Sequence, residues 1–463
     1  MLSQKQLEEL LTRAMASKAD FAEIFEEETQ SEGISLVNED VQDVSRSVIA
    51  GAGIRLYKGL ESVYGYTNDM STEALNALVD DLRDAMGKTE EGKTVELKET
   101  AVQSVHSISA DPFEHPLEEK VDLVLRAVRA AREADEKIVK VTASLSAKRQ
   151  DVQIANSEGR LVKDRRMYIR MPVSAFAQDE KSMQNGTASP GAQKGLEFYY
   201  SDKMPEEIGR EAARMALVLL KAKPAPSGEM PVIIDNGFGG VIFHEACGHS
   251  LEATGVAKGM SVFAGKKGQQ IASPKVTAID DGTIPNAWGS QNIDDEGNPQ
   301  RKRVLIKDGI LNEYMIDQLN ARRMKEPSSG SGRRESYKYE PTSRMSNTFI
   351  APGTDKKEDM FKDIKFGLYC KTMGGGSVNP NPGELKFGVK EAYLIEDGKI
   401  TDPVQGAMLI GSGKDILMNI DMVSDNLDRA QGMCGSVSGS VPTDVGQPCI
   451  RVSSITVGGT ASE

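Results

Sequence analysis

The chain has 463 residues, with 56 basic and 69 acidic side chains and a net charge of −13. Its 39% hydrophobic content is enough for a sizeable core and excludes extensive disorder. The acidic balance disfavours a surface that neutralises phosphates, so we expect no direct nucleic-acid binding.

A first mixed α/β domain is predicted over residues 1–100. An amphipathic helix opens the chain, without the apolar stretch of a signal peptide. Strands are expected at 21–28, 33–45 and 51–67, with hairpin turns at 38–40 and 58–59. A second helix fits 72–86, between an N-cap at Ser71 and a closing Gly87. The polar stretch 88–100 is interpreted as a linker.

A second α/β domain is predicted over residues 101–225. Its first helix is indicated by apolar residues at helical spacing: Leu117, Val121, Val124, Val128 and Ala131. Strands follow over 138–178, with a turn at 157–159, and a further helix fits 205–222. A run rich in proline, 224–228, ends that helix and marks the boundary.

The third domain, 226–463, is predicted to be the largest and rich in strands. Strands are expected at 230–235, 302–317, 392–401 and 449–459. Asp-Gly pairs predict hairpin turns at 281–282, 308–309 and 397–398. Two helices are expected, near 240–254 and near 355–366, the latter capped by Thr354. The irregular alternation predicts an α+β fold, with two mixed α/β units and a β-rich C-terminal domain that carries the helix of a candidate metal site.

No stretch is long and apolar enough for a membrane span, so no membrane association is expected. The four cysteines are too few and too scattered for a disulfide scaffold in a chain of this length. We therefore expect a cytoplasmic protein with reduced thiols.

The segment His244-Glu245-Ala246-Cys247-Gly248-His249 concentrates the chemistry-bearing residues. Zinc proteases with a His-Glu-x-x-His motif carry their histidines at i and i+4 on one helical face. Here the spacing is i, i+5, which leaves the imidazoles about 140° apart in a regular α-helix. One extra residue held in a π-bulge returns them to one face, and we expect Gly248 to ease that distortion.

With that geometry, His244 and His249 are candidate metal ligands. Glu245 is then placed as general base for a water activated by the metal, and Glu252 could orient an imidazole. The third ligand stays open on chemistry alone. Cys434, in a glycine-flanked loop, is slightly favoured, and Cys247 is expected to point away from the face that the histidines share.

Other rare residues are interpreted as structural. His106 and His115 lie in polar segments typical of the surface. Cys370 and Cys449 lie in apolar, strand-like segments, where free cysteine is usually a small buried hydrophobe. Arg333 and Arg334 are candidates for holding a peptide carboxylate or an oxyanion, against a structural role in a loop or ion pair.

Several long stretches resemble the TldD/PmbA family, specifically its TldD branch. The His-Glu motif, 51–69, 280–324, 332–337, 373–378, 391–413 and 433–461 carry the resemblance, which spans essentially the whole chain. It implies a zinc metallopeptidase with one Zn²⁺ per catalytic subunit, held by His244, His249 and Cys434, and Glu245 as general base. Cys449 departs from the residue expected at its position.

The resemblance also implies a cytoplasmic dimer, formed with an identical chain or with a PmbA-like partner that lacks the motif. Its substrates would be unfolded peptides bound in an extended form. Two other functions compete with this one. The first is a non-catalytic, metal-stabilised binding or modulator protein, and the second is an enzyme using the thiol of Cys247 or Cys434.

Overall fold

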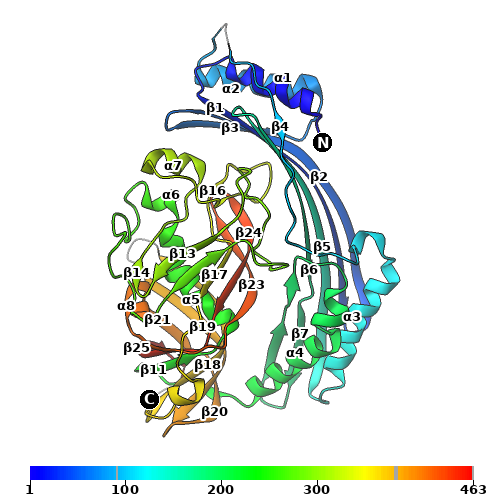
Figure 1. Ribbon diagram of the computed structural model, residues 1–463. Helices are drawn as coiled ribbons and strands as arrows, with labels where there is room; N and C mark the ends of the chain where they lie inside the picture. Colours follow the sequence, from blue (N-terminus) through cyan, green and yellow to red (C-terminus); the bar gives the residue numbers. More distant parts are fainter. Residues whose placement is uncertain (90–91, 380–383, 461–463) are drawn as a thin grey trace.

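The computed structural model describes residues 1–89, 92–379 and 384–460. A long curved sheet lies along one side of the molecule, and a β-rich C-terminal domain sits within its curve (Figure 1). The predicted α+β fold is confirmed, and the C-terminal domain is rich in strands. No helix in the described ranges is long and apolar enough to cross a membrane.

The curved sheet has nine strands, in the order β3-β2-β1-β5-β6-β4, while β7 pairs with β5 and β8, and β9 with β6. Their bounds are β1 Phe21–Val37, β2 Asp40–Lys58, β3 Glu61–Thr67, β4 Lys98–Glu99, β5 Ile138–Asn156, β6 Arg160–Arg170, β7 Val173–Gln178, β8 Met183–Ala188 and β9 Gly191–Ala192. Because β1 pairs antiparallel with β5 over 15 residue pairs, strands of the first two predicted domains share one sheet. The expected turn after β1 is present, at Asn38, whose φ is 53°.

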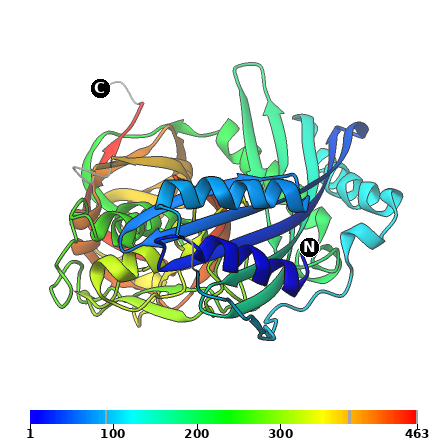
Figure 2. The same ribbon diagram turned by 90° about the horizontal axis from the view of Figure 1, so that it is seen from above.

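Four helices cover this sheet: α1 Gln4–Met15, α2 Thr72–Met86, α3 Leu117–Arg132 and α4 Pro205–Leu220. Helices α1 and α2 lie side by side over one end (Figure 2), and α3 and α4 pack on each other and on β5, β7 and β8. The predicted caps of α2 are confirmed, since the Ser71 side chain accepts from Ala74 N–H and Gly87 closes the helix at φ 94°. The expected linker 88–100 is packed in part, because Val95 and Leu97 are buried and β4 pairs with β6.

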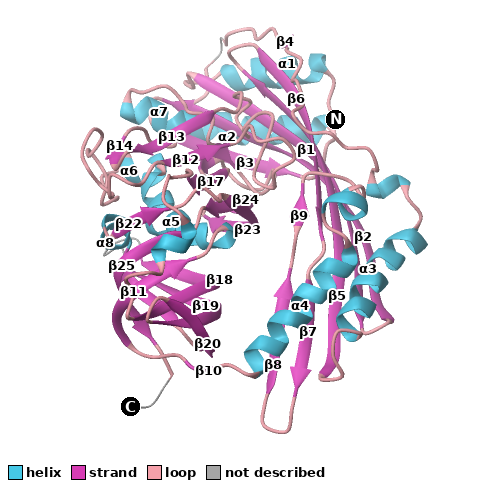
Figure 3. Cartoon of the chain, turned by 60° about the horizontal axis from the view of Figure 1, so that its bottom comes forward, coloured by secondary structure: helices cyan, strands magenta, loops and turns pink. Residues whose placement is uncertain are grey.

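The C-terminal domain contains an eight-stranded sheet, β10-β20-β19-β18-β11-β25-β21 with β22 on β25, and a six-stranded sheet, β14-β13-β12-β17-β24-β23. Because β19 also pairs with β21, part of the first sheet closes into a barrel, of which β11, β18, β19 and β25 are labelled in Figure 3. The first sheet consists of β10 Lys223–Pro224, β11 Gly228–Ile234, β18 Phe366–Asn379, β19 Glu384–Glu396, β20 Lys399–Gln405, β21 Met408–Ser412, β22 Ile420–Val423 and β25 Ile450–Gly458. The second consists of β12 Ala278–Asp281, β13 Lys302–Lys307, β14 Ile310–Leu311, β17 Asn347–Ile350, β23 Asp428–Ser436 and β24 Gly439–Gln447.

The remaining elements of this domain are short. They are α5 Val241–Phe243, α6 Ala253–Val256, α7 Gln318–Met324, α8 Gly413–Met418, and the two-residue strands β15 Gly332–Arg333 and β16 Thr342–Ser343. The hairpin turns expected at 308–309 and 397–398 are confirmed, joining β13 to β14 and β19 to β20. The hairpin turn predicted at 281–282 is wrong. Strand β12 does pair with β13, but residues 282–301 lie between the two strands, so no tight turn joins them.

The helix predicted at 355–366 is also wrong. Only a short 3₁₀ turn forms, Lys357–Met360, and Thr354 does not cap it. Tertiary contacts override the local pattern, since Gly353 N–H donates to the Ser424 carbonyl and Asp355 N–H to the Val423 carbonyl. These bonds hold the first residues of the segment extended beside β22.

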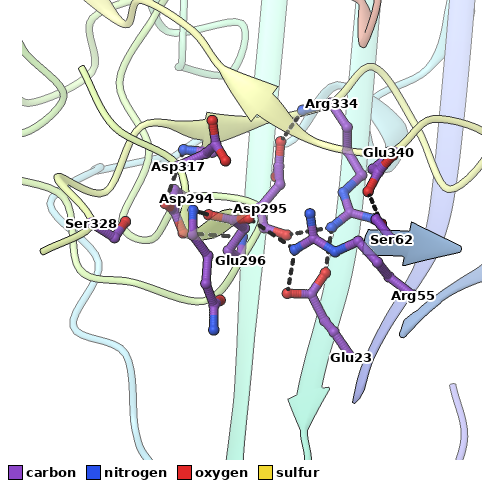
Figure 4. Close-up of polar contacts among 12 residues, drawn as sticks. Glu23, Arg55, Ser62, Asp294, Asp295, Glu296, Asp317, Ser328, Arg334 and Glu340 are labelled. Carbon is purple, nitrogen blue, oxygen red and sulfur yellow. Dashed lines mark hydrogen bonds and ion pairs between the residues drawn. The ribbon is translucent and has the colours of Figure 1, made fainter. Parts of the chain in front are cut away.

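Buried charges join the curved sheet to the C-terminal domain (Figure 4). Arg55 on β2 donates to Glu23 on β1 (3.1 Å) and to Glu296 (2.8 Å), and Arg334 donates to Glu23 (2.7 Å). Arg166 on β6 pairs with Asp295 at 2.6 Å. We call this group the junction cluster; its members are Glu23, Arg55, Asp164, Arg166, Asp294, Asp295, Glu296 and Arg334.

Carboxylates outnumber guanidinium groups in the junction cluster. Burial raises the pKa of Glu296 to about 8, although the nearby charge of Arg55 opposes this shift. Burial also raises the pKa of Asp294, to about 6. Burial therefore shifts both carboxyls toward their protonated forms, and it shifts Glu296 further than Asp294.

Candidate metal centre

The motif segment is helical but changes its winding three times. After a 3₁₀ turn at Gly237–Gly240 come α5, a π-helical turn at His244–Gly248, and a second 3₁₀ turn at His249–Leu251. The expected π-bulge is thus present between the two histidines. It brings their rings to one side, with centroids 5.1 Å apart.

Gly248 is needed for a reason other than the expected one. Its φ of −52° is ordinary helical geometry, so it relieves no backbone strain. A Cβ at this position would instead lie 2.3 Å from the Met345 sulfur. The glycine therefore allows the segment that carries Met345 to pack closely against the π-turn.

Cys434 on β23 completes the cluster. Its Sγ lies 3.1 Å from His244 Nε2 and 3.3 Å from His249 Nε2. One ligand atom from each of the three residues lies within 4.8 Å of the others. The structure thus brings together the three side chains that the resemblance implies as ligands, although Cys434 lies 190 and 185 residues after the two histidines.

The electrostatics of the cluster favour a thiolate. Burial opposes ionisation of Cys434, but the imidazoles of His244 and His249 outweigh it and lower the pKa of the thiol to about 3. Burial likewise opposes protonation of His249, yet Glu252 and Cys434 raise the pKa of this imidazole well above its usual value. A thiolate and two imidazole nitrogens form a donor set that fits zinc.

The ring nitrogens that face away from the cluster are held by oxygen atoms. Thr348 Oγ1 on β17 lies 3.1 Å from His244 Nδ1, and Glu252 Oε1 lies 3.2 Å from His249 Nδ1. Such contacts fix the tautomer and the orientation of an imidazole. The contact of Glu252 agrees with its expected orienting role, while Thr348 had no sequence signal.

Arg344 is a second residue that the sequence did not indicate. It is buried, lies 3.9 Å from Glu252, and donates to the backbone carbonyl of Cys434. Arg344 therefore links the motif segment, through Glu252, to the cysteine strand, whose Cys434 lies 90 residues after Arg344.

Glu245 lies on the accessible side of the cluster. Its carboxylate is 3.8 Å from His249 Nε2, and its side chain is 26% exposed, whereas His244 and Cys434 are buried. Glu245 and His249 are therefore the members of the cluster that solvent can reach.

The two candidate arginines lie away from the three donors. Arg334 belongs to the junction cluster, and Arg333 donates to the Met345 carbonyl at 2.5 Å. Both side chains are buried, and both line a cavity between the curved sheet and the C-terminal domain.

The remaining cysteines and histidines also lie elsewhere. Cys247 and Cys370 are buried in the main core, and burial raises the pKa of each thiol. Cys449 packs in a separate apolar cluster with Ile233 and Tyr369. His106 accepts a hydrogen bond from Asn286 N–H, and His115 pairs with Glu119, so neither joins the donor set.

A buried His-His-Cys cluster beside a partly exposed glutamate defines a candidate metallopeptidase centre. Three family models match the chain: PmbA/TldA metallopeptidase domain 1 over residues 22–86, the central domain over 110–220, and the C-terminal domain over 227–459. The chain belongs to the PmbA/TldA metallopeptidase family, and it is a TldD homologue.

Its relatives include the Metalloprotease TldD homolog of Haemophilus influenzae, 38% identical over 95% of this chain and 93% of the relative. A protein of the same name from Buchnera aphidicola is 36% identical over 98% of this chain and 95% of the relative. The Zinc metalloprotease TldD homolog of Saccharolobus solfataricus is 30% identical over 52% of this chain and 54% of the relative.

Two solved structures share the fold. A putative modulator of a DNA gyrase from Thermotoga maritima superposes with a TM-score of 0.79 at 22% identity, covering 98% of this chain and 99% of the other. TldE from Thermococcus kodakarensis superposes with a TM-score of 0.77 at 19% identity, covering 98% and 100%.

Proposed function

We propose that this protein is a zinc-dependent peptidase that hydrolyses peptide bonds of unfolded, extended peptides. The observation that carries the proposal is the convergence of His244, His249 and Cys434, with the Glu245 carboxylate beside them. One Zn²⁺ per chain would occupy this donor set. The word zinc in the name of the S. solfataricus relative supports the choice of metal.

Zinc bound there would polarise a substrate carbonyl and lower the pKa of a water molecule toward about 7. Glu245 accepts the proton of the attacking water on its carboxylate and passes it to the leaving amine. Its partial exposure lets it meet both groups. Positioned proton transfer of this kind contributes about 10²- to 10⁴-fold to a rate.

The neighbouring residues orient the donors. Glu252 and Thr348 each hold one imidazole through its second nitrogen, so that the Nε2 atoms face Cys434. Arg344 holds the Cys434 carbonyl and thereby the position of the thiolate. We propose these three as positioning residues and Glu245 as the residue that transfers protons.

The test is hydrolysis of an unfolded peptide by zinc-loaded protein, with and without a chelator, and by Glu245→Gln. We expect chelation to abolish cleavage and zinc to restore it. Glu245→Gln should lose about 10²- to 10⁴-fold in kcat while retaining its zinc. Cleavage by Glu245→Gln at the wild-type rate would refute the proposed mechanism.

The same assay separates the competing functions. A non-catalytic modulator would bind zinc without cleaving any unfolded peptide, alone or with a PmbA-like partner. A thiol enzyme would survive chelation and lose activity on alkylation. A control substitution, Cys449→Ala, lies outside the donor set and should leave both zinc content and cleavage unchanged.

We further propose that a second subunit, identical or PmbA-like, covers the outer half of β2. Residues 40–50 of this strand are all exposed, including Val41, Val44, Val48 and Ile49, and pair only with β1 among the described strands. An edge of this kind readily pairs with another chain. Light scattering on the full chain should show a dimer that Val48→Lys weakens; a monomer both alone and with the partner would contradict this proposal.

A further inference from the structure

A cavity of about 380 Å³ lies between the curved sheet and the C-terminal domain. Strands β1, β2, β5 and β6 form one wall, and the β23–β24 hairpin and the segment around Arg333 form the other. Its walls are both apolar and charged, and they include Lys148, Tyr168, Trp288, Arg333, Glu335 and Met433. Nothing proposed above for the metal centre uses this space.

Two cations on the cavity wall lack a carboxylate partner. Among the described residues, no carboxylate oxygen lies within 4.0 Å of the Lys148 ammonium or the Arg333 guanidinium, although Arg333 is only 1% exposed. The single hydrogen bond of Arg333 goes to a neutral carbonyl, and its Nε has no partner. Burial lowers the pKa of both groups, against the opposing charges of Glu27 on Lys148 and of Asp295 on Arg333.

The acidic groups on the same wall are already engaged. Glu32 pairs with Arg46 at 2.5 Å and with Lys120. Glu335 is exposed, and its Oε2 accepts from Ser440 N–H at 2.7 Å. The other two arginines of the wall, Arg166 and Arg334, are neutralised by the junction cluster. Glu27 and Glu335 also act on Lys148, but neither carboxylate forms an ion pair with it, so the Lys148 ammonium and the Arg333 guanidinium remain free to make a direct ion pair with a ligand.

The cavity adjoins the metal centre through two chain segments. Met433 lines the cavity and directly precedes Cys434 on β23. Arg333 bonds the carbonyl of Met345, whose sulfur packs against the π-turn at Gly248. Because successive side chains of a strand point to opposite faces, Met433 and Cys434 place the cavity and the donor cluster on the two sides of β23, an edge strand of its sheet.

The geometry points to this cavity as a carboxylate-binding subsite for the peptide substrate, in which Lys148 and Arg333 bind a carboxylate a few residues from the scissile bond. The inference rests on the proposed peptidase function, because it names a peptide as the ligand. The carboxylate could be the peptide's C-terminus or an acidic side chain. Charge-assisted hydrogen bonds to a buried guanidinium are the stronger kind, so the subsite would select peptides as well as hold them.

The binding test compares peptides that differ only in their carboxylates. Zinc-loaded protein carrying Glu245→Gln, which should not cut during the titration, is mixed with a fluorescein-labelled unfolded peptide in three forms. One form has a free C-terminus, one is amidated, and one is amidated with an internal Gln→Glu change. We expect a carboxylate to tighten Kd by about tenfold or more. Equal Kd for all three forms overturns the subsite, and the form that gains affinity identifies the source of the carboxylate.

Substitutions locate the effect. Lys148→Gln and Arg333→Gln should each reduce the preference for the carboxylate form. The matched control Lys163→Gln removes a positive charge from an exposed site on β6, where Lys163 pairs with Glu99, and should keep the preference. Retention of the preference in both cavity variants also overturns the subsite. The peptide comparison itself needs no change in the cavity, so it stands even if a variant misfolds.

Turnover by the unmodified, zinc-loaded protein separates this inference from the proposed function. Cleavage without any carboxylate preference leaves the peptidase in place and removes the subsite. A carboxylate preference in Kd without cleavage leaves the subsite in place and removes the peptidase.

Discussion

The junction cluster and the cavity beside it differ in the sign of the buried charge that is in excess. In the junction cluster carboxylates are in excess, and burial raises the pKa of Glu296 and of Asp294. In the cavity cations are in excess, and across the described ranges neither Lys148 nor Arg333 forms an ion pair with a carboxylate. Arg333 and Arg334 are adjacent in sequence, yet only Arg334 is paired. The difference teaches that a buried charge neutralised within the chain serves the fold, whereas one left without a partner marks a place for a ligand.

The largest expected effect lies at the third site of buried charge, the metal centre. Cys434→Ala removes the thiolate and leaves two imidazoles that cannot complete the donor set. We expect the variant to retain no zinc after dialysis and to lose peptide cleavage entirely. Metal analysis by mass spectrometry checks this, with Cys370→Ala, a buried cysteine outside the cluster, as the control. Stoichiometric zinc in Cys434→Ala would show that the metal lies elsewhere.

The paired arginine should matter more for stability than the unpaired one. Arg334→Met removes a partner of Glu23 in a buried pair, and we expect the free energy of unfolding to fall by about 3 kcal/mol. Arg333→Met removes a buried cation that has no carboxylate and should cost less. Urea denaturation of both variants compares them directly. If Arg333→Met were the more destabilising change, the contrast between the two regions would be wrong.

A smaller effect is expected where a side chain only orients a ligand. Glu252→Gln keeps the size of the side chain but removes the charge that holds His249. Zinc affinity should fall by about 10- to 100-fold without loss of folding. Competition with a fluorescent zinc chelator measures it, and unchanged affinity would assign Glu252 to its contact with Arg344 instead.

The smallest effect is a pH dependence of stability. Burial raises the folded-state pKa of Glu296 to about 8 from an ordinary 4.5. The folded state therefore binds the proton more tightly, and this contribution to stability is complete below about pH 4.5 and decreases until about pH 8. Glu296→Gln should flatten the pH profile of the urea midpoint across this window. An unchanged slope would mean that another group holds the proton.

Local signals predicted most helices and hairpins of the fold. The caps Ser71 and Gly87 act within one turn, and the Asp-Gly pairs at 308–309 and 397–398 act between neighbouring strands. The failures at 281–282 and 355–366 arise where distant strands decide the outcome, as with the bonds from 353–355 to β22. Nothing local revealed that β1 and β5, over 100 residues apart, would share a sheet.

For the candidate site, spacing alone predicted the π-turn, because no other winding places His244 and His249 together. Cys434 was only slightly favoured by its glycine-rich surroundings and needed the family resemblance. Thr348 and Arg344 were missed, since a threonine or arginine in a distant strand has no distinguishing pattern. The ion pair of Arg334 likewise depends on Glu23 of β1, far away in the chain, and nothing near Arg333 in sequence indicated that this residue would lack such a pair.

The π-turn has a consequence for how this segment could change. It behaves as a helix that has accepted one inserted residue and widened locally to keep its downstream register. Removing Ala246 would restore a His-Glu-x-x-His spacing, and a plain α-turn would then align the two imidazoles. The residues after it would keep the register that the widened turn now gives them, so Leu251 and Glu252 would stay beside their present neighbours. The widened turn is therefore what allows one short segment to present two histidines and still keep its core contacts.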